Sequence, residues 1–170
     1  MTVKVLSRTA LLLALMLLFQ SLRLYLPMPV FISAYIVGSL VNACLLLAAA
    51  ALGPKPVSAL AVVAPVIAYL QQVLPLPFLI LPVAAANLAY IGGYLLTSSR
   101  GSWPAITAAA TAKFIILYLT VTILIEYLGV TGRPAAVLTL MLGWPQWITG
   151  LGGGVIFFAV HRRLFRLISN

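Results

Sequence analysis

The chain has 170 residues, of which 64% are hydrophobic and only 6% are charged, and its formal net charge is +9. A soluble domain carries roughly 25% charged residues, so this composition excludes a soluble enzyme, a soluble nucleic-acid-binding domain and a disordered chain. We expect an all-α integral membrane protein whose positive charge lies in cytoplasmic loops facing anionic lipid.

Six apolar segments are long enough to cross a membrane, since about 20 residues span a hydrocarbon core roughly 30 Å thick. They predict a six-transmembrane-helix bundle in one domain that covers residues 1–170. The predicted helices are 7–26, 33–52, 57–74, 78–97, 104–128 and 135–162. Clusters of proline, glycine and serine separate them. The break at Pro75 and Pro77 is the weakest of these.

The basic residues predict that both termini are cytoplasmic, because lysine and arginine accumulate in cytoplasmic loops. With the N-terminus inside, only Arg23 and Arg133 lie outside. The cytoplasmic set is Lys4, Arg8, Lys55, Arg100, Arg162, Arg163 and Arg166. The first span could also be a signal peptide, but no small-residue cleavage site follows it in Gln20-Ser21-Leu22-Arg23. We therefore expect it to remain as a membrane helix.

Few residues could carry catalytic chemistry. The chain has one cysteine, Cys44, one acidic residue, Glu126, and one histidine, His161. An intramolecular disulfide, paired carboxylates, a His–Asp relay and a His/Glu metal cluster are therefore impossible within one chain. The sequence has no P-loop pattern either. We expect no catalytic residues, no metal site and no cofactor.

The amide side chains of the predicted spans all fall at or outside the membrane midplane, as judged from a rise of about 1.5 Å per residue. These residues are Gln20, Asn42, Gln71, Gln72, Asn87 and Gln146. The inner half carries small residues four apart instead, Ala10 with Ala14 and Gly150 with Gly154. Such pairs let helix backbones approach closely. The pattern predicts an outer layer that captures a polar solute and an inner layer that packs against other helices.

Lys113 is the strongest candidate for a ligand contact. It lies about nine residues, or roughly 14 Å, into the fifth predicted span. Inserting a lysine into the membrane at the centre of a helix costs about 2.5–3.5 kcal/mol of free energy. Ionisable groups at such depth face the bundle interior or a water-filled cavity. No acidic residue within the spans can pair with it, so a ligand anion would supply the counter-charge. Two alternatives stay open: the lysine reaches back to the cytoplasmic interface, or it is uncharged.

The sequence Trp144-Pro145-Gln146-Trp147 predicts a disturbed helix at a similar depth. A proline inside a helix removes one hydrogen bond and clashes with the carbonyl four residues earlier, here that of Met141. Broken helices at mid-depth form binding sites in transporters. The alternatives are a plain kink, and amides that only join helices. The predicted substrate-binding residues are Lys113, Asn87, Trp144, Gln146, Asn42, Tyr90 and Gln71.

Six short spans, cytoplasmic termini and the sequence Ala10-Leu11-Leu12-Leu13-Ala14 together resemble an S component of an energy-coupling factor (ECF) transporter. These ABC importers take up vitamins and their precursors across the prokaryotic plasma membrane. The resemblance implies that Ala10 and Ala14 dock on a membrane coupling protein, and that two ATPase subunits drive the cycle. It also implies a substrate site in the outer half. Metal-specific members begin with Met-His, whereas this chain begins Met1-Thr2, which argues against nickel or cobalt.

The predicted site suits a small vitamin or precursor, either with a carboxylate or with a heteroaromatic ring. A central lysine, several amides and nearby aromatic side chains would bind such a molecule. The alternative function is a structural membrane scaffold similar to the MreD proteins of the cell-elongation machinery, which have a similar size and number of spans. A scaffold needs no ligand, and Lys113 would then have no evident purpose.

Overall fold

The computed structural model describes residues 2–25 and 29–168, and the side chains in these ranges except those of 30, 31 and 164–168. All regular structure in this part of the chain is helical, without a strand. Two short 3₁₀ helices, η1 (Pro77–Leu79) and η2 (Ser98–Arg100), flank α4. The α-helices are α1 (Val3–Tyr25), α2 (Val30–Leu52), α3 (Pro54–Leu70), α4 (Ile80–Thr97), α5 (Ser102–Tyr127), α6 (Arg133–Leu142) and α7 (Trp144–Ile168).

Four helical segments are long and apolar enough to cross a membrane, namely Val3–Tyr25, Ile32–Leu52, Pro77–Arg100 and Ser102–Tyr127. Large apolar side chains on their outer faces are exposed, as lipid contact requires; examples are Leu11, Leu81 and Ile123. These features are those of a multi-pass membrane protein. The apolar helix α3 is shorter, with 17 residues.

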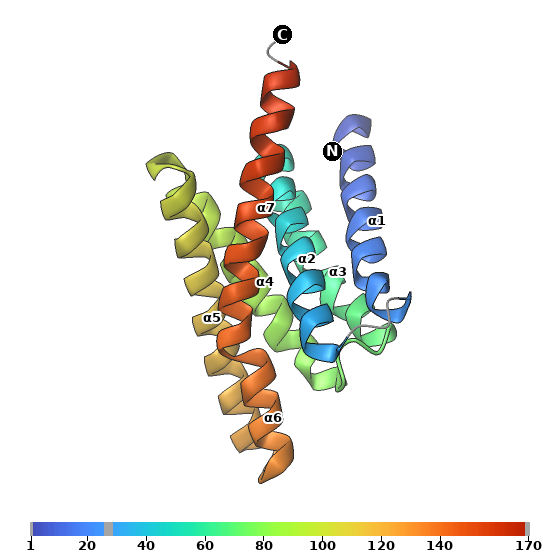
Figure 1. Cartoon of the computed structure of the whole chain (residues 1–170), viewed down its shortest axis with the longest axis vertical. Helices are drawn as coiled ribbons and strands as arrows, with labels where there is room; N and C mark the ends of the chain where they lie inside the picture. Colours follow the sequence, from blue (N-terminus) through green and yellow to red (C-terminus); the bar gives the residue numbers. More distant parts are fainter. Residues whose placement is uncertain (1, 26–28, 169–170) are drawn as a thin grey trace.

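Successive long helices run in alternating directions, so that α1 begins and α7 ends at the same end of the bundle (Figure 1). We call this the terminal end and the other the distal end. α7 packs against α2 and α5, α4 packs mainly on α5, and α1 stands at the edge of the bundle against α2 and α3. The short helix α6 lies at the distal end.

Glycines bring α7 close to its neighbours. A Cβ atom on Gly153 would lie 2.5 Å from the Asn42 Cβ atom of α2, and a Cβ atom on Gly154 would collide with Ile106 of α5. A Cβ atom on Gly150 would lie 3.0 Å from the Ala110 Cβ atom. The predicted close packing along Gly150 and Gly154 is confirmed, and it joins helices of this chain to one another.

Two predicted spans differ from the observed helices. The third ends at Leu70, not at residue 74, because the chain turns there and Gln72 adopts a positive φ of 56°. The last is interrupted at Gly143, where a Cβ atom would lie 2.6 Å from the Thr139 carbonyl oxygen. Pro145 therefore lies in the first turn of α7, where N–H groups have no partner within the helix, so the missing N–H of proline costs no hydrogen bond. It does not kink a continuous helix.

Candidate functional site

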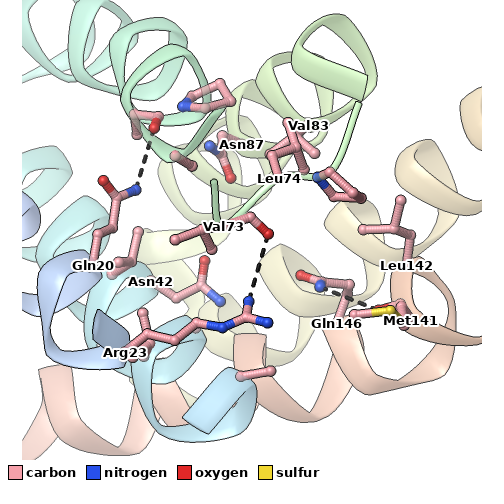
Figure 2. A pocket seen from close by; sticks show the side chains of 18 of the residues that line it. Gln20, Arg23, Asn42, Val73, Leu74, Val83, Asn87, Met141, Leu142 and Gln146 are labelled. Carbon is pink, nitrogen blue, oxygen red and sulfur yellow. Dashed lines mark hydrogen bonds between the residues drawn. The ribbon is translucent and has the colours of Figure 1, made fainter. Parts of the chain in front are cut away.

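A cavity of about 170 Å³ opens between the helices near the distal end, beside the end of α1 and the segment that joins α3 to η1 (Figure 2). All seven α-helices contribute to its walls, which are mostly apolar. Its lining does not include Glu126, the single acidic residue. The polar lining residues are Gln20, Arg23, Asn42, Asn87, Lys113 and Gln146.

Lys113 is the buried lysine of this cavity, with 5% of its surface exposed. Its Nζ donates to Asn42 Oδ1 over 2.6 Å and to Asn87 Oδ1 over 3.0 Å. The ring of Tyr90 lies 5.4 Å from Nζ, within the range of a cation–π contact. An ammonium group has three N–H donors, so one remains for a group that enters the cavity.

The two asparagines are held with their oxygens toward Lys113. Asn42 Nδ2 donates to Thr149 Oγ1 over 3.4 Å, and Asn87 Nδ2 donates to the Ala61 carbonyl over 3.2 Å. The Ala61 carbonyl is available because Pro65, four residues later in α3, has no N–H to donate. Since an ammonium group can only donate, the two amide oxygens are the acceptors that two of its N–H groups need.

The interruption between α6 and α7 borders the same cavity. Met141 and Leu142 at the end of α6 line it together with Gln146 of α7. Gln146 Nε2 donates to the Met141 carbonyl at the end of α6 over 3.5 Å. This contact is at the long limit for a hydrogen bond, so Gln146 is free to change partners.

Four of the seven predicted substrate-binding residues, Lys113, Asn87, Asn42 and Gln146, line this one cavity although they come from four helices. Tyr90 does not line it; its hydroxyl donates to the Gly150 carbonyl over 2.7 Å.

The other two predicted residues lie outside this cavity. Trp144 is 54% exposed and lines a second cavity of about 90 Å³, which shares Gln146 with the first. Gln71 donates to Ser21 Oγ over 3.0 Å and thereby ties the end of α3 to α1. The structure thus groups Trp144 with Gln146 but separates Gln71 from the Lys113 cavity.

Two polar lining residues, Gln20 and Arg23, are not among the predicted substrate-binding residues, although Gln20 belongs to the predicted outer layer of amides. Gln20 Nε2 donates to the Ala64 carbonyl over 3.2 Å. Arg23, which the sequence places at the outer side of the membrane, is half-buried and donates through Nη1 to the Val73 carbonyl over 3.5 Å. Met16 and Gln20 are buried four residues apart, and Arg23 follows three residues later. That helical spacing was the available signal.

Ala10 and Ala14 are both exposed on α1, and their spacing places them on one face of the helix. The buried residues of α1 are Met16 and Gln20, in its second half. In the first half of α1, other helices of the described chain leave Ala10 and Ala14 exposed, beside larger apolar side chains such as Leu11.

Replacing Tyr90 by phenylalanine should lower the free energy of unfolding by about 0.5–1.5 kcal/mol, because the hydroxyl loses its bond to Gly150. The ring that faces Lys113 is kept, so we expect unchanged retention of ligand by the purified protein. Denaturant titration and mass spectrometry measure the two effects, with the exposed Tyr127→Phe as control. Loss of ligand in Tyr90→Phe would instead assign its hydroxyl to the ligand.

Comparison with protein-family models, with curated proteins and with solved structures finds no match to this chain. The chemistry of the site is therefore the basis for a functional assignment.

Proposed function

We propose that this chain is the substrate-binding S component of an ECF-type importer in the prokaryotic plasma membrane. It captures a small vitamin or vitamin precursor from outside, for ATP-driven uptake by a coupling protein and two ATPase subunits. The observation that carries the proposal is a buried lysine with one N–H donor left over, in a cavity without a carboxylate. A protonated lysine in so apolar a place is stabilised by a partner of opposite charge.

The chemistry and size of the cavity favour a small anionic ligand. Lys113 and Arg23 supply positive charge, and Gln146 supplies an adaptable amide. The volume of about 170 Å³ is below the roughly 300–1,000 Å³ of pockets for drug-sized ligands. A compact carboxylate, with or without a flat ring, meets both conditions.

The distribution of charge supports six membrane crossings with both termini in the cytoplasm. Lys4 and Arg8 begin α1, Lys55 begins α3, and Arg100 ends η2, all at the terminal end. The positive-inside rule assigns that end to the cytoplasm. The cavity, near the distal end, then faces outward. In this arrangement α3 and the α6–α7 pair complete the six crossings.

The test of this function is uptake. The protein is reconstituted in vesicles with an ECF coupling protein and its two ATPases, and the compound that co-purifies with the protein is supplied outside. Accumulation that requires both ATP and this chain is the expected result. A reconstituted, assembled complex that accumulates nothing would contradict the proposal and favour a structural scaffold.

Tryptophan at Ala10 or Ala14 should block assembly with the coupling protein, because a bulky side chain prevents close approach of helices. Ligand binding should not change, since neither alanine lines the cavity. Leu96→Trp is the matched control, at a site that is 83% exposed near the terminal end of α4. Co-purification of the partner subunits measures assembly, and unchanged assembly of both alanine variants would contradict the docking role.

A further inference from the structure

The cavity contains a second cation besides Lys113. Arg23 lines it from the end of α1, and Figure 2 shows the side chain extending toward Val73 among the polar groups of the cavity. A guanidinium group has five N–H donors. Only one of them has a protein acceptor in the described structure, the Val73 carbonyl at 3.5 Å. That distance is at the long limit for a hydrogen bond, so little free energy holds the side chain in this position.

The two cations reach the cavity from different walls. Lys113 comes from α5, where Asn42 and Asn87 fix its ammonium group. Arg23 comes from α1 and lies next to the segment that joins α3 to η1. No carboxylate lines the cavity. The positive charges of Lys113 and Arg23 therefore repel each other, and no negative charge in the lining offsets this repulsion. A ligand with one anionic group would neutralise one of them and leave the other.

We infer that Arg23 is a second anchor of the ligand, and that the ligand carries two anionic groups, one for Lys113 and one for Arg23. On binding, Arg23 exchanges the Val73 carbonyl for the second anionic group, for which a guanidinium offers two parallel donors. This inference rests on the proposed function and narrows its substrate class to small dianions such as dicarboxylates.

Three probes of equal chain length test the inference: glutarate with two charges, pentanoate with one, and glutaramide with none. Binding is measured by calorimetry on the full chain in nanodiscs of neutral phosphatidylcholine. We expect glutarate to bind about 10- to 100-fold more tightly than pentanoate, the range for one hydrogen bond to a charged group, and glutaramide not to bind. Arg23→Gln should remove the advantage of glutarate over pentanoate.

Arg23→Lys and Arg133→Gln are the matched variants. The first keeps the charge but loses the paired donors, so it should restore part of the preference for glutarate. The second removes an exposed arginine at the start of α6 and should change nothing. Equal affinity of the wild-type protein for glutarate and pentanoate, or an unchanged preference in Arg23→Gln, would overturn the inference. The anion site at Lys113 would then stand, whereas failure of every probe to bind would overturn that site as well.

Discussion

Replacing Lys113 by alanine is expected to abolish ligand binding. Removing one partner of a buried, hydrogen-bonded charge pair costs about 2–5 kcal/mol, which corresponds to a loss of affinity of roughly 30- to 4,000-fold. The side chain is 5% exposed and lines the cavity, so no other lysine can replace it. Native mass spectrometry of the purified variant, compared with wild type, measures the retained ligand. Lys55→Ala is the control because Lys55 is exposed at the start of α3.

The same substitution also has a structural effect that must be separated from binding. Without the ammonium group, Asn42 Oδ1 and Asn87 Oδ1 lose their donor, at about 1–3 kcal/mol for each oxygen left unsatisfied. Water in the adjoining cavity reduces this penalty. Lys113→Gln retains an N–H donor for one of the oxygens but carries no charge. A folded Lys113→Gln protein that still binds ligand at wild-type affinity would contradict the role of the charge.

Gly153→Ala is expected to destabilise the bundle by about 1–3 kcal/mol, the range for overpacking a filled interior. The added methyl group would lie 2.5 Å from Asn42 Cβ and 2.8 Å from the Ser39 carbonyl oxygen. The latter is a backbone atom, so α2 and α7 must move apart. Because Asn42 is a partner of Lys113, we also expect weaker ligand binding. Denaturant titration in mixed micelles measures the change in unfolding free energy.

Gly92→Ala is the matched control for that prediction. Gly92 lies in α4, and an added Cβ atom would meet nothing within 4 Å. Alanine is favoured over glycine within a helix by about 0.8–1.0 kcal/mol, so this variant should be as stable as wild type or more stable. Equal stabilities of Gly153→Ala and Gly92→Ala would contradict the close contact between α2 and α7.

The sequence predicts the helices best where apolar segments have unambiguous ends. The predicted spans 33–52, 78–97 and 104–128 differ from α2, α4 and α5 by a few residues. Polar breaks such as Gly53 and Gly101, both with positive φ, mark their ends. The last span was less predictable, because Pro145 can either kink a helix or begin one. Its role depends on Gly143, whose packing against the Thr139 carbonyl is not visible in the sequence.

The residues around Lys113 at the centre of the cavity were predictable from the sequence, whereas Arg23 at its edge was not. Depth along each helix was enough to group Lys113 with Asn42 and Asn87, since polar groups within a membrane seek one another. Depth alone could not place Arg23, because a residue at a helix end can face either water or a cavity. The packing of α1 against α3 decides that, and it arises from contacts far apart in the sequence.

The most direct test of a solute-binding role is native mass spectrometry of the wild-type protein, purified in mild detergent and released from it in the gas phase. We predict one small anionic molecule per chain, bound in wild type and in Lys55→Ala but missing from Lys113→Ala. An empty wild-type protein that also fails to bind small carboxylates and vitamins added back to it would contradict a solute-binding role and favour a structural one.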